Sequence, residues 1–281
     1  MRSLNLPSGF GLLGRLIFGI TGPRQTILGT ELAGVVECIG KDVTKFKVGD
    51  RVFAFSGAKM GCHAEYKCFN EDDAIAIIPD QLSFDEAAGL SFGGSTALHF
   101  LRQAKIQKGE KVLINGASGG VGTAMVQLAK HLGAEVTGVC STKNLELVRS
   151  LGAGRAIDYT AEDFTADGEV YDVIADVAGT APLRRCARSL REDGRLLLVL
   201  AGLPELLSIP WAALTSRRRI VAGPGPERAE VLRELARLAA AGGFRPVAGR
   251  RFRLEDIVVA HRYVDTGHKR GNAVVCVRAA P

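Results

Sequence analysis

The chain has 281 residues, of which 47% are hydrophobic and 23% are charged, so it has the composition of a globular protein with an ordinary core. That composition excludes a disordered chain, a collagen-like repeat and a small disulfide-stapled domain. The formal net charge of +6 would suit an anionic partner, but the arginines are scattered and no aromatic residues alternate with them to stack on bases. We expect a small-molecule substrate, with neither a nucleic acid nor a membrane as partner.

Neither end of the chain nor its cysteines indicate secretion. The longest apolar run, Leu196–Leu203, is far shorter than the roughly 20 residues that span a bilayer. The apolar stretch at 9–20 is interrupted by Arg15 and lacks a signal-peptidase site. The six cysteines are irregularly spaced without a CxxC pair, which argues against a disulfide framework and a four-cysteine zinc site. We therefore expect free thiols and a cytoplasmic location.

The first third of the chain predicts a small, barrel-like β domain. Short runs rich in β-branched residues are separated by turn signals such as Val48-Gly49-Asp50. At Ser83 the pattern changes, because Ser83 and Glu86 form a capping box that predicts a helical stretch to about Gln103. The strands that we expect in this domain are Leu32–Ile39, Arg51–Phe55, His63–Phe69 and Ala74–Ile78.

From Lys111 onward, short apolar runs alternate with helix-length segments, which is typical of a doubly wound parallel sheet in an α/β protein. The strands that we expect are Lys111–Asn115, Glu135–Val139, Arg155–Asp158, Asp172–Asp176, Arg195–Ala201 and Arg219–Ala222. The helices that we expect are Gly120–Leu132, Lys143–Leu151, Pro182–Leu190 and Glu227–Ala241. The tail then predicts a helix over Leu254–Val264 and a strand over Ala273–Val277, which return to the first domain.

The strongest local signal is a glycine-rich turn between a predicted strand and a predicted helix, Gly116-Ala117-Ser118-Gly119-Gly120-Val121-Gly122. Such a turn lets backbone N–H groups at the helix N-terminus approach a pyrophosphate. Gly119 and Gly122 match the second and third glycines of GxGxxG, and Ala117 takes the place of the first. The surrounding strand and helix pattern favours a dinucleotide site over a glycine turn without a ligand.

The end of the second strand distinguishes between two dinucleotides. NAD-binding proteins usually carry Asp or Glu about 20 residues after the glycine turn, where it binds the ribose 2′-hydroxyl. Residues 139–144 contain no carboxylate, whereas Ser141 offers a hydroxyl and Lys143 a cation suited to a 2′-phosphate. We therefore expect NADPH rather than NADH. In the alternative interpretation, Ser141 is a helix cap and Lys143 an ordinary surface lysine.

Together these segments resemble the medium-chain dehydrogenase/reductase superfamily, and within it the zinc-independent quinone oxidoreductase (zeta-crystallin-like) branch. The resemblance implies an N-terminally shortened GroES-like catalytic domain over 1–90, a Rossmann NADP-binding domain over 91–243, and a return to the catalytic domain over 244–281. It also implies a cleft between the domains as the active site, and a homodimer. The segments that carry it are the glycine turn, Gly29-Thr30-Glu31-Leu32-Ala33-Gly34-Val35-Val36, Val48-Gly49-Asp50-Arg51-Val52 and Gly267-His268-Lys269-Arg270-Gly271.

The resemblance further implies which residues contact the cofactor. One group would contact the cofactor, with its last residue beside the adenosine 2′-phosphate: Thr96, Gly116, Ala117, Ser118, Gly119, Gly120, Val121, Gly122, Ser141, Lys143 and Tyr159. A second group would face its nicotinamide half, with the last residue reaching it from the tail: Ala178, Gly179, Leu200, Ala201, Gly202 and Asn272. Alternatively, Tyr159 is a strand-end aromatic and Asn272 a turn residue. No residue stands out as a proton donor, and Thr96 is a candidate for positioning only.

The chain departs from zinc-dependent members of the superfamily in the residues that would bind metal. Those members carry Gly-His-Glu where this chain has Gly29-Thr30-Glu31, and the cysteine-rich zinc lobe is missing. Cys62, His63 and Cys68 could be imagined as ligands, but adjacent strand residues point to opposite faces, so we interpret them as structural. We expect no metal. Hydride transfer to a quinone or an α,β-unsaturated carbonyl suits that absence, because the charge is delocalised on an enolate.

Two other functions stay open at this point: an enoyl- or alkenal-specific reductase, and a noncatalytic NADPH-binding protein. The second arises because superfamily members usually carry about fifty further residues before the segment that matches Leu12. Those residues form the first barrel strands and part of the substrate wall. Either the sequence is truncated or mis-started, or the barrel is incomplete and the cleft unusually open. A missing wall would weaken substrate positioning more than cofactor binding.

Overall fold

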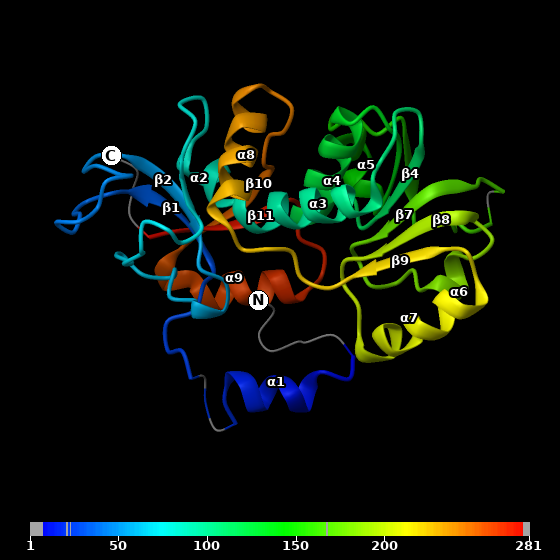
Figure 1. Ribbon diagram of the computed structural model, residues 1–281, viewed down its shortest axis with the longest axis horizontal. Coiled ribbons are helices and arrows are strands. Elements are labelled where there is room, and N and C mark those ends of the chain that lie inside the picture. The colour runs from blue at the N-terminus through cyan, green and yellow to red at the C-terminus, as the bar shows by residue number, and fades with distance from the viewer. Residues whose placement is uncertain (1–7, 21, 23, 167, 278–281) are drawn as a thin grey trace. The chain divides into compact units, whose positions relative to one another are not determined.

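The computed structural model describes residues 8–20, 22, 24–166 and 168–277, and the chain forms two compact units (Figure 1). One unit consists of Arg15–Ser95 together with the chain from Pro226 on, and the other contains 8–14 and Thr96–Gly225. The sequence-based boundaries after residues 90 and 243 follow the domains of the family and stay a prediction. None of the helices in the described ranges is long and apolar enough to cross a lipid bilayer.

The unit around Thr96–Gly225 contains a six-stranded parallel sheet in the order β6-β5-β4-β7-β8-β9. Strand β4 is buried along four of its five residues, as expected where helices cover both faces of a parallel sheet. The connections reverse direction between β4 and β7, where doubly wound sheets bind ligands. The strands are β4 (Lys111–Asn115), β5 (Glu135–Cys140), β6 (Arg155–Asp158), β7 (Tyr171–Asp176), β8 (Leu190–Leu198) and β9 (Arg219–Ala222).

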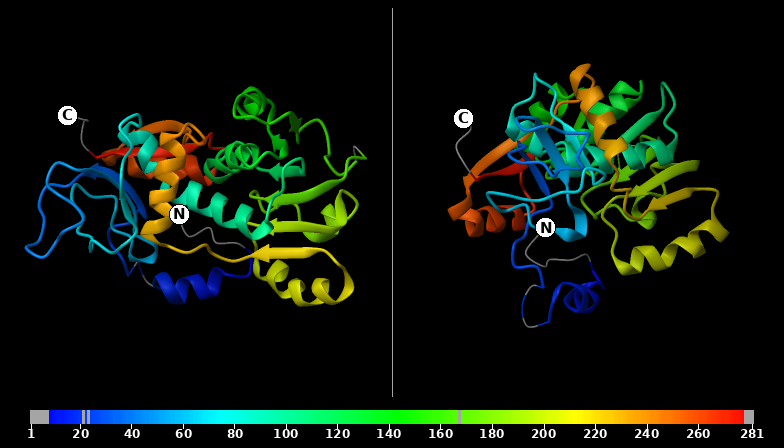
Figure 2. Two further views of the ribbon diagram at one scale, coloured as in Figure 1. Left: turned by 45° about the horizontal axis from the view of Figure 1, so that its top comes forward. Right: turned by 60° about the vertical axis from the view of Figure 1, so that its left-hand side comes forward.

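Helices cover both faces of this sheet. Helices α4 and α5 lie on one face, and α6 and α7 lie on the other, as both views of Figure 2 show. The core beneath them is built from apolar side chains of five strands, among them Leu113, Val139, Ile157, Ile174 and Leu196. The bounds are α4 (Gly120–His131), the 3₁₀ helix η2 (Thr142–Asn144), α5 (Leu145–Ser150), α6 (Leu183–Cys186) and α7 (Leu203–Thr215).

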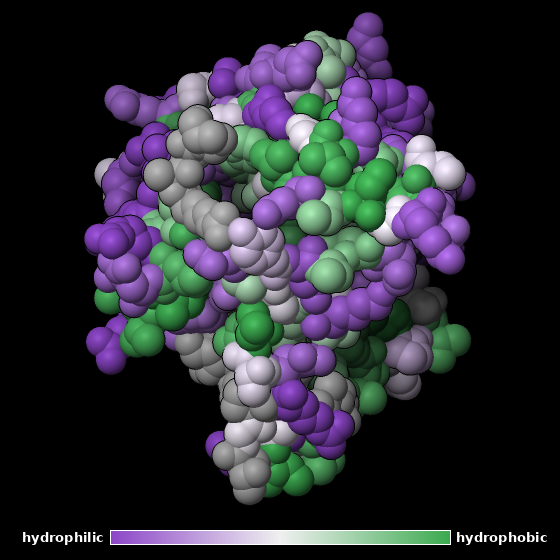
Figure 3. All heavy atoms as spheres, turned by 90° about the vertical axis from the view of Figure 1, so that its left-hand side faces the viewer, coloured by the Kyte–Doolittle hydropathy of each residue, from purple (hydrophilic) through white to green (hydrophobic). Residues whose placement is uncertain are grey.

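The other unit contains two small sheets. Strands β1 (Glu31–Val35), β2 (Arg51–Phe55) and β3 (Ile75–Ile77) form an antiparallel sheet, and β10 (Ala248–Arg253) pairs in parallel with β11 (Asn272–Cys276). Hydrophobic residues lie in small groups among hydrophilic ones on the face shown in Figure 3. The remaining elements are η1 (Gly57–Lys59), α2 (Phe84–Ala88), α8 (Ala229–Ala240), η3 (Leu254–Asp256) and α9 (Ile257–Asp265).

The expected doubly wound sheet and the GroES-like β unit are confirmed, but one predicted strand is wrong. No strand covers His63–Phe69. The backbone N–H groups of Cys62 and His63 donate to the carbonyls of Gly29 (3.1 Å) and Leu28 (2.9 Å), and no ladder continues along the described residues that follow. The alternation of residue types was correct for a strand, but a strand also needs a neighbour with which to pair.

The helical stretch expected over 83–103 is interrupted. The capping box of Ser83 and Glu86 is present and begins α2, but the helix ends at Ala88 and α3 (Ser91–Ala104) follows. The chain bends at Gly89, where an added Cβ would lie 2.5 Å from the Nδ2 atom of Asn272. A larger residue at this C-cap position of α2 would therefore overlap the side chain of Asn272, which lies 183 positions further along the chain.

Four elements were not predicted, and others differ in length. Helices α1 (Gly11–Phe18) and α7, the 3₁₀ helix η1 and strand β10 had no expected counterpart, and the helix expected over Pro182–Leu190 is reduced to α6. Helix α7 contains Pro210, a residue that normally breaks helices, and its apolar side chains face outward. Leu207, Trp211 and Leu214 are 70%, 71% and 83% exposed. The sequence of α7 therefore has neither the buried apolar stripe of a core helix nor the polar surface of a solvated one, and no helix was expected there.

Candidate cofactor-binding site

The glycine turn after β4 is tightly packed where it meets β5 and α4, but it leaves space beside Gly119. Gly116 has a φ of +88°, and the N–H groups of Gly116 and Ala117 both donate to the carbonyl of Val139 on β5. An added Cβ on Gly122 would lie 2.1 Å from the carbonyl oxygen of Gly116, so helix α4 touches the turn there. An added Cβ on Gly119 would have only that same oxygen near it, at 3.8 Å.

This shape fits a dinucleotide. The first N–H groups of a helix have no partner within the helix, and α4 begins immediately after Gly119 at the carboxyl edge of the sheet. The space that a side chain would occupy on Gly119 is vacant, so a phosphate could approach the backbone closely. Gly119 and Gly120 lie at the start of α4, and Ala117 is fully buried and supports the turn from inside. The assignment of the turn residues to a cofactor stays a prediction.

A buried carboxylate organises the strand ends beside the turn. Asp176, at the end of β7, is 2% exposed. Its Oδ1 atom accepts hydrogen bonds from the Nδ2 atom of Asn115 at 2.9 Å and from the N–H groups of Gly179 at 2.9 Å and Thr180 at 3.2 Å. Its Oδ2 atom accepts the N–H of Ala181 at 2.8 Å. The loop that carries Gly179 is therefore fixed in shape by one side chain.

The loops after β7 and β8 lie against each other and against the glycine turn. An added Cβ on Gly116 would meet the Cβ of Ala178 at 3.2 Å, and one on Gly179 would meet the side chain of Leu200 at 3.1 Å. Gly202 donates its N–H to the Oε2 atom of Glu205 at the start of α7. The structure thus brings together Gly116, Ala178, Gly179 and Leu200, which were assigned to the two halves of one cofactor.

The end of β5 presents the residues that were assigned to the 2′-phosphate. Ser141 precedes η2, and Lys143 lies exposed within it. Asn144 is 3% exposed and donates from Nδ2 to the hydroxyls of Ser141 and Ser118, both at 3.2 Å. The amide of Asn144 therefore links the loop after β5 to the glycine turn.

A second carboxylate lies one strand further along. Asp158, at the end of β6, accepts the hydroxyl of Thr142 at 2.5 Å and the hydroxyl and N–H of Thr160 at 2.7 and 3.0 Å. These hydrogen bonds, that of Thr142 first, lower the pKa of Asp158, so it is ionised at neutral pH. Tyr159 follows it, is 50% exposed, and donates its N–H to the carbonyl of Cys140. The ends of β5 and β6 are thereby joined.

Sequence reasoning missed Asn144, Asp158 and Asp176. A signal for the two carboxylates was present, because each is the last residue of a predicted parallel strand, where polar groups meet at one edge of the sheet. No comparable signal marked Asn144. Its amide becomes functional only because two serines from different loops come within reach of it.

Two further residues that were predicted to contact the cofactor, Thr96 and Asn272, lie in α3 and β11. Thr96 lies in α3, whose first turn is held by the buried carboxylate of Glu31, which accepts the N–H of Phe92 at 2.7 Å. Burial raises the pKa of Glu31. The Nδ2 atom of Asn272 donates to the carbonyl of Val247 at 3.4 Å. The assignment of both Thr96 and Asn272 to the cofactor stays a prediction.

Of the residues considered as metal ligands, Cys62 and His63 contact other side chains. The sulfur of Cys62 lies 3.3 Å from the hydroxyl of Ser56, and burial raises the pKa of this thiol. The ring of His63 meets the edge of His261 at 5.9 Å, and burial, followed by the neighbouring His261, lowers the pKa of His63. Cys68 is exposed. In the described ranges no three His, Cys, Asp or Glu side chains are grouped so that they could hold a metal ion.

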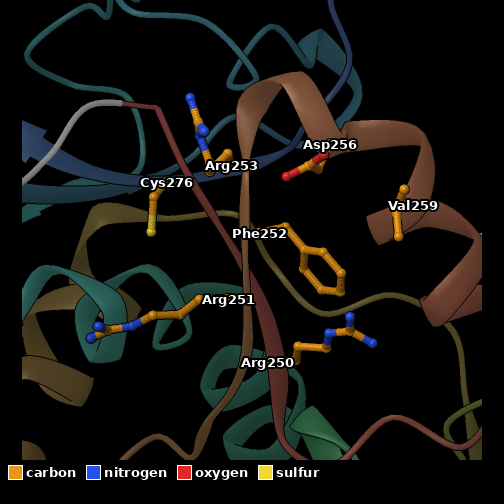
Figure 4. A pocket seen from close by; sticks show the side chains of 7 residues that line it. All are labelled: Arg250, Arg251, Phe252, Arg253, Asp256, Val259 and Cys276. Carbon is orange, nitrogen blue, oxygen red and sulfur yellow. The ribbon is translucent and has the colours of Figure 1, made fainter.

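A surface pocket in the unit that contains β10 and β11 is lined by Arg250, Arg251 and Arg253 (Figure 4). Arg250 lies over the rings of Phe252 and Tyr263, at 4.9 and 5.6 Å. Arg251 forms an ion pair with Asp85, and Arg253 forms one with Glu255. Two of the three arginine charges are therefore balanced by carboxylates, whereas Arg250 rests on neutral aromatic rings.

Comparisons with known proteins agree with this geometry. Residues 13–97 match the family model described as an alcohol dehydrogenase GroES-like domain, and residues 151–275 match the one described as a zinc-binding dehydrogenase. The quinone oxidoreductase of Coxiella burnetii has a solved structure that is 33% identical, with a TM-score of 0.83 over 97% of this chain and 84% of that one. The chain belongs to the medium-chain dehydrogenase/reductase superfamily.

Two relatives of this medium-chain dehydrogenase/reductase come from plants. The chloroplastic quinone-oxidoreductase QR1 of Triphysaria versicolor is 33% identical over 88% of this chain and 78% of its own length. The chloroplastic NADPH-dependent alkenal/one oxidoreductase of Arabidopsis thaliana is 32% identical over 90% of this chain, which spans 64% of that relative.

Two glycine substitutions should separate folding from binding in this medium-chain dehydrogenase/reductase. We expect Gly122→Ala to lower the free energy of unfolding by about 1–3 kcal/mol or more, because its Cβ would overlap the carbonyl of Gly116. Gly119→Ala should lower the free energy of unfolding by less than about 1 kcal/mol, since the backbone conformation of Gly119 suits any residue. The added methyl group would occupy the space for the phosphate, so we expect dinucleotide binding to weaken at least tenfold. Urea unfolding and NADPH titration would measure both. Unimpaired binding by a folded Gly119→Ala variant would contradict this site.

Proposed function

We propose that the protein is an NADPH-dependent reductase that transfers hydride to a quinone or to an α,β-unsaturated carbonyl compound. The observation that carries the proposal is the glycine cradle at the switch point of the sheet, combined with a strand end that offers Ser141 and Lys143 but no available carboxylate. Asp158 is the nearest carboxylate along the sheet edge, and two threonines bind it. The relatives named for quinone and NADPH-dependent alkenal/one reduction support the same assignment.

The residues of the sheet edge would hold the cofactor along its length. The turn at Gly119 and the N-terminus of α4 would bind the pyrophosphate, with Ser141, Lys143 and Tyr159 at the adenosine end. The loops that carry Ala178, Gly179, Leu200, Ala201 and Gly202 would line the nicotinamide half. Asp176 keeps the first of these loops in one conformation, which reduces the entropy that binding must remove.

The cofactor, when bound, supplies a hydride, and the chemistry left to the protein is modest. A quinone or enone that accepts hydride delocalises the resulting charge over a conjugated oxygen, so strong electrostatic stabilisation is not required. The chain needs to orient two flat molecules and to exclude water between them. We assign no proton donor, and we retain Thr96 as a positioning candidate on α3.

Turnover is the direct test. The purified chain should oxidise NADPH in the presence of small quinones or enones and should use NADH less well.

Lys143→Glu should raise the Kd for NADPH tenfold or more and leave that for NADH within about twofold, because only NADPH carries the 2′-phosphate. The matched control is Lys41→Glu, the same charge change at an exposed position of the other unit.

The outcomes of this test separate the competing functions. Equal effects of Lys143→Glu on both nucleotides would contradict the 2′-phosphate assignment. Tight NADPH binding without consumption across the panel would indicate a noncatalytic binding protein. Activity confined to enones and alkenals would indicate the narrower reductase.

We also propose that the reaction needs no zinc, since Thr30 stands where a ligand would be required and the nearby Cys62 and His63 face other partners. Active protein should contain far less than one equivalent of zinc by elemental analysis and should keep its activity after treatment with 1,10-phenanthroline. Loss of activity that added zinc restores would overturn this proposal.

A homodimer in the cytoplasm completes the proposal. Strand β9 is an edge strand, and the adjoining α7 exposes Leu207, Trp211 and Leu214. Edge strands and contiguous apolar side chains are both features that a second copy can cover. The six cysteines are free thiols, as is usual in a reducing compartment.

Sedimentation should give twice the chain mass. We expect Leu207→Glu combined with Leu214→Glu to produce monomers, whereas Ser208→Glu on the same helix should leave the dimer intact. A monomeric unmodified chain at micromolar concentration would rule the dimer out.

A further inference from the structure

The amide of Asn144 makes two hydrogen bonds that bear on the chemistry of the cradle. Its Nδ2 atom carries two hydrogens, and it donates to the Oγ atoms of Ser118 and Ser141, at 3.2 Å each. The backbone N–H of Asn144 donates to the carbonyl of Ser141 at 2.8 Å, which keeps this amide in place. Because Asn144 is 3% exposed, water does not compete for these bonds. Ser118 belongs to the glycine turn and Ser141 to the loop after β5.

The direction of these bonds determines what the two serines can do. A hydroxyl has one hydrogen and two lone pairs, and here Asn144 uses a lone pair on each serine. The hydrogen bonds among the described residues give neither hydroxyl an acceptor within the protein. Both hydroxyl hydrogens are therefore available to an external anion, and both side chains are partly exposed. Asn144 thus prepares the two serines as donors before any ligand arrives.

The neighbouring threonines show the opposite arrangement. Thr142 and Thr160 donate their hydroxyl hydrogens to the carboxylate of Asp158, at 2.5 and 2.7 Å. Their hydrogens are consumed inside the protein, so they cannot serve as donors to a phosphate without breaking these bonds. The adjacent residues Ser141 and Thr142 therefore differ: the hydroxyl hydrogen of Ser141 is available to a ligand, whereas that of Thr142 fixes the loop.

We propose that Asn144 is a positioning residue that sets the preference for NADPH, by directing the hydroxyl of Ser118 to the pyrophosphate and that of Ser141 to the 2′-phosphate. The inference rests on the proposed NADPH binding and adds the residue that couples the two phosphate subsites. Both nucleotides carry the pyrophosphate, but only NADPH carries the 2′-phosphate. Loss of Asn144 should therefore weaken NADPH more than NADH.

Nucleotide fragments allow a test that does not depend on turnover. Isothermal titration of 2′-phospho-ADP-ribose and of ADP-ribose would compare ligands that share the pyrophosphate and differ only in the 2′-phosphate. We expect Asn144→Ala to raise the Kd for 2′-phospho-ADP-ribose at least tenfold and that for ADP-ribose about threefold, since one charge-assisted hydrogen bond is lost in the second case and two in the first. Asn144→Asp should be worse, because its carboxylate would accept the serine hydrogens and repel phosphate.

A double-mutant cycle with Ser141→Ala makes the test specific. If Asn144 acts through Ser141, adding Asn144→Ala to Ser141→Ala should not further change the ratio of the two Kd values. If Asn144 only stabilises the fold, the two substitutions should have independent effects, and all ligands should weaken equally. Either of these last results would overturn the inference.

Controls separate this inference from the proposed function and from misfolding. Circular dichroism and thermal unfolding would show whether each variant folds, and Asn144→Ser provides a smaller polar replacement should Asn144→Ala unfold. With Asn144→Ser, one short hydroxyl cannot reach both serines, so the same shift in the ratio is expected. If the unmodified chain shows no preference for 2′-phospho-ADP-ribose over ADP-ribose, the NADPH assignment itself fails. If the preference is present but Asn144 variants retain it, the role of Asn144 alone is wrong.

Discussion

Asp176 links three strand ends, and the geometry of the candidate site depends on it. Its side chain binds Asn115 at the end of β4 and the loop after β7, while its main-chain carbonyl accepts the N–H groups of Val199 and Leu200 at the end of β8. A carboxyl group in so buried a position is tolerated only because several donors surround it. Those donors are the amide of Asn115 and the backbone of a loop that a dinucleotide would touch, so the buried side chain and the site stabilise each other.

Side chains also link neighbouring loops on the other side of the switch point between β4 and β7. Asp158 joins the loops after β5 and β6, and Asn144 joins the loop after β5 to the glycine turn. Polar side chains therefore connect the ends of β4, β5, β6 and β7 and the loops that follow them, whereas the strands themselves are held by apolar packing. These bonds are in place without a ligand, and such preorganisation is a general route to affinity without additional contacts.

The sequence predicted the sheet well because each of its strands is a short apolar run that local composition identifies. All six strands and the helix after the glycine turn were expected, and the turn itself was placed correctly, since glycines leave a strong local signal. The errors arise where distant residues decide. The lack of room for a side chain at Gly89 is set by Asn272, and the missing strand at His63–Phe69 reflects the lack of a pairing partner. The importance of Asn144 depends on two loops meeting, which no local pattern encodes.

The unit that contains the small sheets is assembled from two stretches of chain separated by 130 residues, Thr96–Gly225. Helix α2 is bound to the later stretch through Glu86 with Arg245 and Asp85 with Arg251, and Gln81 donates to the carbonyl of Ala240. During synthesis on the ribosome, the sheet-forming unit is therefore available in full before the other unit has received its last strands. The earlier stretch can form its own apolar cluster around Val52, Ala54 and Ile75, but the side chains that α8 covers beside β3 stay exposed until the later stretch has been made. This interval is one in which the growing chain is open to aggregation.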